Sequence, residues 1–349
     1  MSAAAPTTIA VISPVDNPAL RSMPRDDPTL CFLVADTSAE LLAMPGIEAA
    51  EALLFVPPGN PAVLGEVYPH MPKVSWVHSF FAGVDALAPF VRSHLLPGGA
   101  AAAAASTAST AKGDVPLTNG KGAFSASLAE WVMTAALHFN KQMPRVLRNR
   151  QERVWDKFVM NTLSGKTIGL VGFGHIGQTT ARMAKAGFGM RVLACRRNAG
   201  SAEASAGGLA DVVYGIEDKA RLFAESDFVV CALPGTPETA DFCGALEFAA
   251  MKESGVFISI GRGLAVDENA LAEALLAKSI AGAALDVFKK EPLPQESKLW
   301  ECENLILTAH NADFTDDYFD LGWSVWRSNL DGLRDGSGLV TAVDKTAGY

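Results

Sequence analysis

The chain has 349 residues, more than one ordinary domain needs, so we expect two domains. Its 29 Lys and Arg against 38 Asp and Glu give a formal net charge of −9, which argues against nucleic acid or an anionic membrane as a partner. The 5 cysteines show neither CxxC nor zinc-ligand spacing, so we expect no metal and a reduced, cytoplasmic protein. No apolar run approaches the roughly 20 residues of a membrane span.

Short apolar runs alternate with helical patterns along most of the chain, which predicts an α/β fold with parallel, doubly wound sheets. A helix with a cap at Ser127 and a capping-box partner at Glu130 is predicted before the second set of strands, and a closing helix is predicted from about 316. The stretch 97–114 is Ala-rich and nearly uncharged, so we expect a low-complexity surface insertion. The predicted strands cover 8–13, 31–35, 52–57, 73–80, 167–173, 191–195, 227–234, 256–261, 281–288 and 304–310.

A glycine-rich turn follows the strand predicted over 167–173. Gly172, Gly174 and Gly177 in GFGHIG have the GxGxxG spacing, and a helical pattern begins at once. These glycines would allow a tight turn, a close approach of the backbone to a pyrophosphate, and close packing of helix on strand. The backbone of His175 and Ile176, at the helix N-terminus, would face the negative charge. Glycine-rich turns also occur without ligands, but the order strand, motif, helix, strand predicts a dinucleotide-binding site.

Two arginines stand where the next strand, 191–195, ends. Arg196 lies nineteen residues after Gly177, where an NAD site carries an acidic residue for the ribose hydroxyls. A carboxylate would repel a 2′-phosphate, whereas the guanidinium groups of Arg196 and Arg197 can bind one. The pair therefore predicts NADP(H) as the preferred cofactor and NAD(H) as the alternative, unless both arginines are simply solvated.

Three ionisable residues follow later strands. Arg262 comes just after 256–261, Glu291 comes after 281–288, and His310 ends 304–310. Because the carboxyl ends of parallel strands meet at one edge, we expect these side chains to gather there. Each also has a structural alternative: Arg262 pairs with an acidic neighbour, His310 is a half-buried histidine with satisfied hydrogen bonds, and Glu291 is solvated.

Several motifs in order resemble the D-isomer-specific 2-hydroxyacid dehydrogenase family, which includes glyoxylate and hydroxypyruvate reductases. They are GFGHIG, LPGTPET, GRGLAVDENAL, ALDVFKKEPLP and LTAHNA, with HSFFAGVDAL and LTNGKGAFSASLAEW nearer the N-terminus. The resemblance covers nearly the whole chain apart from the Ala-rich stretch and about thirty N-terminal residues. It implies two Rossmann-like domains, with a nucleotide domain, 121–315, inserted into a substrate domain made of 1–120 and 316–349.

The resemblance also implies catalytic roles. The arginine that matches Arg262 holds the substrate carboxylate, the histidine that matches His310 passes a proton to or from the C2 oxygen, and the glutamate that matches Glu291 hydrogen-bonds the imidazole. An adjacent carboxylate favours imidazolium, the acid form. The backbone N–H groups of Ala82 and Gly83 would also bind the substrate carboxylate.

Further cofactor contacts and a homodimer follow from the same resemblance. Relatives commonly dimerise through the nucleotide domain, and we expect the contact near Trp131 and Trp155. One departure concerns Lys289 and Lys290, which replace an acidic residue often found just before the glutamate. The residues implied to contact the cofactor in addition to the glycine loop and the arginines are Leu233, Pro234, Thr239 and Asp286.

These features predict an NADP(H)-dependent reductase of small 2-oxoacids, with glyoxylate or hydroxypyruvate as substrate. One alternative is an NAD-linked D-2-hydroxyacid dehydrogenase that works in the oxidative direction. Another is a dinucleotide-sensing binding protein similar to corepressors of this fold. Such a sensor needs only the cofactor site, so the joint presence of Arg262, Glu291 and His310 favours an enzyme.

Overall fold

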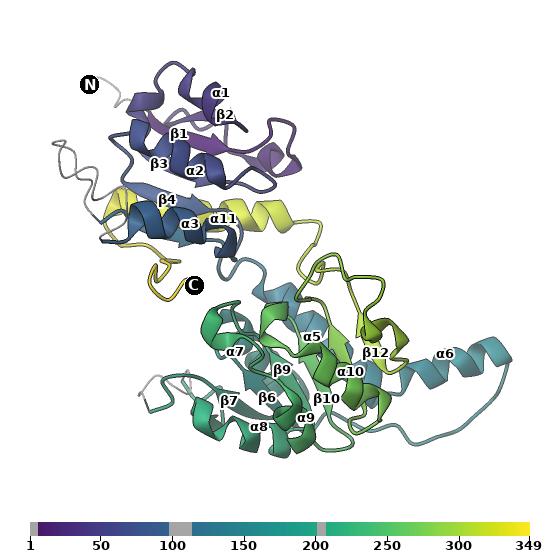
Figure 1. The fold of residues 1–349 in the computed structure, drawn as a ribbon. Coiled ribbons are helices and arrows are strands. Elements are labelled where there is room, and N and C mark those ends of the chain that lie inside the picture. The colour runs from purple at the N-terminus through teal and green to yellow at the C-terminus, as the bar shows by residue number, and fades with distance from the viewer. Residues whose placement is uncertain (1–5, 98–113, 201–206) are drawn as a thin grey trace. The chain divides into compact units, whose positions relative to one another are not determined.

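The computed structural model describes residues 6–97, 114–200 and 207–349 and divides into two compact units. The first comprises Met1–Phe124 and Asp316–Tyr349, and the second comprises Ser125–Thr315. The chain therefore leaves the first unit once and returns to it at the end (Figure 1). The insertion predicted at 97–114 lies outside the described residues, apart from its two terminal positions.

The first unit is built on a five-stranded parallel sheet in the order β2-β1-β3-β4-β5. Apart from the edge strand β2, buried residues dominate the strands, as in a sheet that is covered on both faces. The last strand is only three residues long, and the sequence did not predict it. The strands are β1 (Thr7–Ile12), β2 (Leu30–Ala35), β3 (Ala52–Phe55), β4 (Trp76–Ser79) and β5 (Leu117–Asn119).

Helices cover both faces of this sheet. The C-terminal helix packs Trp323 and Trp326 against one face, where the ring of Trp326 lies 6.0 Å from that of Trp76. The shorter helices and their loops form a separate apolar core on the other face. The helices are α1 (Ser38–Leu42), α2 (Ala62–Val67), α3 (Ala88–Phe90) and α11 (Tyr318–Asp335).

The second unit contains a seven-stranded parallel sheet in the order β12-β11-β10-β9-β6-β7-β8. Six of its strands match predicted ones, whereas the three-residue β8 was not predicted. Two parallel, doubly wound α/β sheets confirm the predicted fold class. The strands are β6 (Thr167–Val171), β7 (Arg191–Cys195), β8 (Val212–Tyr214), β9 (Phe228–Cys231), β10 (Val256–Ser259), β11 (Gly282–Leu285) and β12 (Leu305–Leu307).

The helices of the second unit include one that departs from the sequence prediction. The predicted cap at Ser127 is wrong, because α5 already begins at Ser125 and the Ser127 hydroxyl donates instead to the Ala312 carbonyl at 2.6 Å. Among the helices of the described ranges, none has the length and apolar composition that crossing a membrane requires. The helices are α5 (Ser125–Asn140), α6 (Met143–Glu152), α7 (His175–Arg182), α8 (Lys219–Glu225), α9 (Ala245–Ala250) and α10 (Glu268–Leu276).

Candidate active site

Most predicted site residues lie just beyond the carboxyl ends of the strands of the second unit. From β6 the chain builds β7 and β8 on one side and then returns to the other side of β6 at β9. Such a reversal is where open α/β sheets bind ligands. The glycine-rich turn follows β6 and the stretch 232–234 follows β9, so the two segments flank the reversal.

The glycine-rich turn has the geometry of a phosphate cradle. Gly172 has a φ of +96°, and a Cβ there would lie 2.7 Å from the Ala232 carbonyl oxygen. A Cβ on Gly177 would overlap the Gly172 carbonyl, so helix and turn touch through backbone alone. Gly174 differs, because a Cβ there would meet nothing within 4 Å. This open space lies directly before α7, which begins at His175 and directs its N-terminal N–H groups outward, and it fits a dinucleotide pyrophosphate.

The two arginines follow β7. The backbone N–H of Arg196 donates to the Tyr214 carbonyl at 3.1 Å, which fixes the chain where the strand ends. Arg196 is half-buried and Arg197 is exposed. The Glu238 carboxyl has a pKa below its usual range because it accepts from its own backbone N–H and from Thr236, and the charge of Arg197 adds to this. Arg197 is therefore within electrostatic reach of the turn that follows β9.

The segment 233–239 forms a turn whose residues have different roles. Leu233 and Pro234 are half-buried. Thr239 is 8% exposed, and its hydroxyl donates to the Pro234 carbonyl at 2.6 Å and accepts from the Thr236 N–H at 2.9 Å. Thr239 therefore holds the turn together, and its contact with a cofactor stays a prediction.

His310 and Glu291 meet, as the sequence suggested. Imidazole Nδ1 lies 2.7 Å from Glu291 Oε2, and because a carboxylate only accepts, Nδ1 carries the proton of this bond. The other carboxylate oxygen, Oε1, accepts from the Phe288 N–H at 2.9 Å. The two side chains are 39% and 36% exposed, so the imidazole is held on one side and open to a ligand on the other. His310 also has a φ of +51°, a conformation that costs free energy for a residue with a side chain.

Asp286 holds this strained segment in place. It is 1% exposed, and its carboxylate accepts from the Thr308 hydroxyl at 2.6 Å and from the N–H groups of Asn311 and Ala312 at 3.0 and 3.2 Å. Its carbonyl accepts from the His310 N–H at 2.8 Å. The Asp286 side chain thus supports the segment that carries His310, and the predicted contact of Asp286 with the nicotinamide stays a prediction.

Arg262 follows β10 and is half-buried, with Nη1 donating to the Gly261 carbonyl at 3.0 Å. Asp313, which the sequence reading missed, links Arg262 to His310 electrostatically. Burial raises the pKa of the Asp313 carboxyl, the charges of His310 and Arg262 oppose that rise, and Asp286 adds to it. Asp313 therefore lies within electrostatic reach of His310, Arg262 and Asp286. The only signal in the sequence was an acidic residue three positions after the histidine.

The remaining predicted residues belong to the first unit. Ala82 is exposed and Gly83 is half-buried in the loop after β4, and no described residue accepts a hydrogen bond from either N–H. The loop is held by Asn119, whose amide donates to the Ala82 carbonyl at 2.6 Å. Phe80, beside the loop, is fully buried against Trp323, so it is a packing residue.

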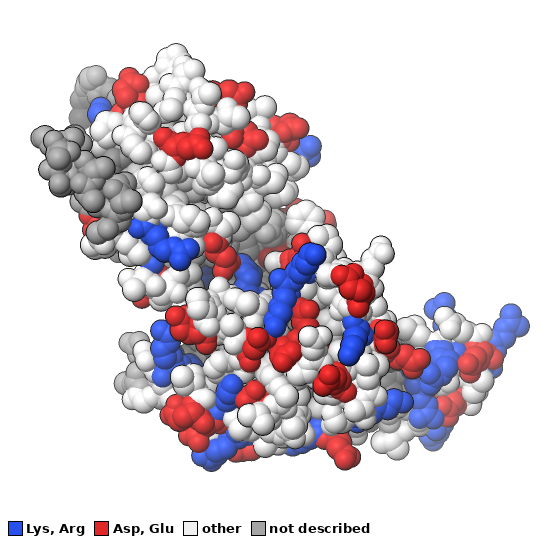
Figure 2. All heavy atoms as spheres, viewed as in Figure 1, with Lys and Arg blue, Asp and Glu red and all other residues white. Residues whose placement is uncertain are grey.

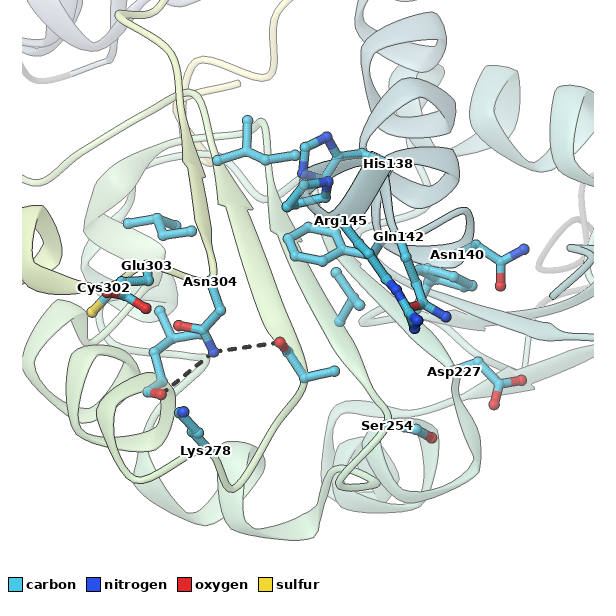
Figure 3. A pocket seen from close by; sticks show the side chains of 18 of the residues that line it. His138, Asn140, Gln142, Arg145, Asp227, Ser254, Lys278, Cys302, Glu303 and Asn304 are labelled. Atoms are coloured by element: carbon cyan, nitrogen blue, oxygen red, sulfur yellow. Dashed lines mark hydrogen bonds between the residues drawn. The ribbon is translucent and has the colours of Figure 1, made fainter. Parts of the chain in front are cut away.

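The second unit also has a cavity of about 870 Å³ away from these residues. Figure 3 shows it beneath the end of α5, where His138 and Asn140 lie opposite Asn304. Asn304 donates to the Leu275 and Ala281 carbonyls, both at 3.4 Å. Phe228, the first residue of β9, also lines the cavity, which places it at the amino ends of the strands and away from the candidate active site.

Comparison with known proteins finds reductases among the relatives of the chain. A probable 2-ketogluconate reductase from Dictyostelium discoideum is 41% identical over 145 residues, or 42% of each chain. A glyoxylate reductase from Thermococcus gammatolerans is 39% identical over 188 residues, or 54% of each chain. The matched segment thus spans about half the length of these curated relatives.

The fold comparison extends over nearly the whole chain. A crystal structure of a D-isomer specific 2-hydroxyacid dehydrogenase family protein from Aeromonas salmonicida superposes with a TM-score of 0.74 and 28% identity, covering 97% of this chain and 99% of that one. The family model described as D-isomer specific 2-hydroxyacid dehydrogenase, NAD binding domain, matches residues 133–312, just over half of the chain. The chain belongs to the D-isomer specific 2-hydroxyacid dehydrogenase family.

Proposed function

We propose that the protein is an NADP(H)-dependent reductase of small 2-oxoacids, with glyoxylate or hydroxypyruvate as substrate. The observation that carries the proposal is the 2.7 Å pair of His310 Nδ1 and Glu291 Oε2, which lies at the same sheet edge as Arg262 and the glycine-rich turn. A sensor of dinucleotides needs the turn but has no use for this pair. Glyoxylate and 2-ketogluconate, which the names of the two relatives contain, are both 2-oxoacids.

Each residue contributes one step. Arg262 would bind the substrate carboxylate through its guanidinium fork and draw electron density from the neighbouring carbonyl. His310, with Nδ1 held by Glu291, would donate the proton on Nε2 to the carbonyl oxygen as that oxygen becomes a hydroxyl. A bound reduced nicotinamide would supply the hydride to the carbonyl carbon. The left-handed backbone at His310 would aim the ring, and Asp286 would maintain that conformation.

The cofactor would lie along the glycine-rich turn. The N–H groups at the start of α7 would bind the pyrophosphate, and Arg196 with Arg197 would bind the 2′-phosphate. The electrostatic reach of Arg197 to the turn after β9 supports this placement, because that turn flanks the same reversal in strand order. A reducing compartment such as the cytoplasm is consistent with the five free cysteines.

We further propose a homodimer formed through α6 and the segment that follows it. Figure 1 shows this arm reaching out from the second unit, and α6 buries none of its residues. Trp155 is 100% exposed and Val159 81%, an apolar surface that a monomer rarely presents to water. In Figure 2, Lys and Arg gather along the same arm. The buried amide of Asn140, whose Nδ2 has no partner among the described residues, lines the neighbouring cavity and would gain an acceptor from a second copy.

The test of the reaction is a turnover screen with both cofactors. Glyoxylate, hydroxypyruvate, pyruvate, 2-ketogluconate and branched 2-oxoacids are each supplied with NADPH and with NADH, and oxidation of the cofactor is followed by absorbance. We expect turnover with NADPH, and we expect His310→Ala to lower kcat by at least about a thousandfold while NADPH fluorescence titration gives an unchanged Kd. His70→Ala, at an exposed histidine outside the site, is the control. NADPH binding without turnover on any 2-oxoacid would instead favour the sensor.

A further inference from the structure

The peptide between Phe288 and Lys289 connects the candidate catalytic residues. The N–H of this peptide, from Lys289, donates to Glu268 Oε1 at 2.5 Å. The N–H of the preceding peptide, from Phe288, donates to Glu291 Oε1 at 2.9 Å. A Cβ on Gly263, the residue after Arg262, would overlap the Phe288 carbonyl. The backbone of Phe288 therefore packs against the residue after Arg262 through its carbonyl and holds the Glu291 carboxylate through its N–H.

The side chain of Lys289 extends this connection to a third loop. Its Nζ pairs with Asp241, which lies 48 residues earlier in the loop after β9. Asp241 has a φ of +50°, and its N–H donates to the Leu264 carbonyl at 2.9 Å. Asp241 is thus anchored to the segment that carries Arg262, and the ion pair ties that segment to the loop that carries Glu291.

The charges around this ion pair are close enough to affect one another. Burial raises the pKa of the Glu268 carboxyl, the charges of Glu291 and Asp241 raise it further, and Lys289 opposes the rise. Glu291 in turn contacts His310 directly, and Asp313 lies within electrostatic reach of His310, Asp286 and Arg262. Lys289 and Asp241 therefore contribute opposite charges to one small cluster of ionisable groups.

We propose that Lys289 and Asp241 are positioning residues for the reaction: their ion pair clamps the loop that carries Glu291 and keeps the charge beside the His310–Glu291 pair balanced. This inference rests on the proposed function. The clamp needs both partners, so the loss of either one loosens Glu291. The charge balance depends on which partner is lost, because Lys289 carries a positive charge and Asp241 a negative one.

The test compares Lys289→Met, Asp241→Asn and the double variant with the wild type. Asn is well suited to the left-handed backbone at position 241, so Asp241→Asn removes charge without straining the loop. Lys289→Arg keeps the pair and serves as the conservative rescue. Lys252→Met is the matched control, since it breaks the 3.0 Å ion pair with Asp227. Asp227 directly precedes β9, so this pair lies at the amino ends of the strands, away from the candidate active site.

The expected results separate the clamp from the charge balance. Both single variants lower kcat about 3- to 10-fold, as loss of the clamp requires. The basic limb of the kcat/KM profile for the reduction moves up by about half a pH unit in Lys289→Met and down by about as much in Asp241→Asn at low ionic strength. In the double variant the limb returns to the wild-type position, whereas kcat stays low. Lys289→Arg and Lys252→Met keep both properties.

A second readout needs no turnover. The imidazole signal of His310, assigned by its absence in His310→Ala, is titrated by NMR in the protein labelled at histidine carbon. Its midpoint should rise in Lys289→Met and fall in Asp241→Asn. Shifts in the same direction in both variants, or no shifts, would overturn the inference and leave the proposed function intact. A wild type without turnover on any 2-oxoacid would overturn the proposed function, while the NMR titration would still decide the charge balance.

Discussion

A buried histidine in the first unit should make the protein sensitive to mild acid. His78, near the end of β4, is 1% exposed, and its Nδ1 lies 2.6 Å from the Thr118 hydroxyl. Its Nε2 is buried and has no hydrogen-bond partner in the part of the chain that the structure describes. The imidazolium would therefore bury its Nε2–H without an acceptor, and burial lowers the pKa of His78 to about 3.

The size of the effect follows from the two protonation states. In the unfolded chain the imidazole has its ordinary pKa of 6.5, so between pH 6.5 and about 3 the unfolded state binds a proton that the folded state does not. The stabilisation from a neutral His78 is complete above pH 6.5 and is lost as the pH falls toward 3. At pH 5 the loss amounts to about 2 kcal/mol relative to pH 7.5.

The assay is urea unfolding at pH 7.5 and at pH 5.0, followed by tryptophan fluorescence. Trp76 of β4 lies with Trp323 and Trp326 in one apolar core of the first unit, so three of the 6 tryptophans report on this unit. In His78→Asn the side-chain amide can replace the Nδ1 bond to Thr118. The free energy of unfolding of this variant should fall by about 2 kcal/mol less than that of the wild type over the same pH interval.

His70→Asn, at an exposed histidine, should retain the full wild-type pH dependence. Carboxyl groups elsewhere contribute equally to all three proteins and cancel in the comparison. Equal pH dependence in wild type and His78→Asn would refute the reasoning. If it holds, the first unit loses stability over the acid limb of any activity profile, so the basic limb is the better report on the chemistry.

Three further outcomes are expected. Arg196→Asp should weaken NADPH binding about 100-fold and NADH binding far less, measured by fluorescence titration; equal losses would remove the argument from the arginine pair. Asp286→Asn should lower the free energy of unfolding by about 3 kcal/mol, because donors of the segment 308–312 lose a charged acceptor. The kcat of this variant should fall as well. Urea unfolding curves that match the wild type would contradict the supporting role assigned to this carboxylate. Trp155→Ser should shift sedimentation toward the monomer while Trp300→Ser, at another exposed tryptophan, should not, and a wild type that is already monomeric would exclude the dimer.

The fold was largely predictable because its strands are apolar and separated by turn or helix signals. Strands β5 and β8 were missed because three residues are too few to show a periodic pattern of apolar side chains. These two strands are defined by their hydrogen bonding to β4 and β7 in the folded sheets. The cap at Ser127 was misassigned for a related reason. Its hydroxyl bonds to Ala312, 185 residues away, and that partner exists only after folding.

The candidate site was predictable where a residue lies shortly after its own strand. Arg262, Glu291 and His310 have this property, and the structure brings the last two into contact. The ion pair between Lys289 and Asp241 was not predictable, since no local pattern links two loops 48 residues apart. The sequence marked Lys289 as a departure from the family pattern, and only the structure supplied its partner.

The order of the two units along the chain bears on biosynthesis. The second unit is one uninterrupted stretch, Ser125–Thr315, whereas the first unit lacks α11 until Asp316–Tyr349 has been made. During translation, the sheet of the first unit is therefore made early but keeps one apolar face uncovered until α11 has been made. The second unit can complete its core before that point. A ribosome that stalls shortly before α11 is translated would leave a nascent chain whose central portion is native and whose first third is a client for holdase chaperones.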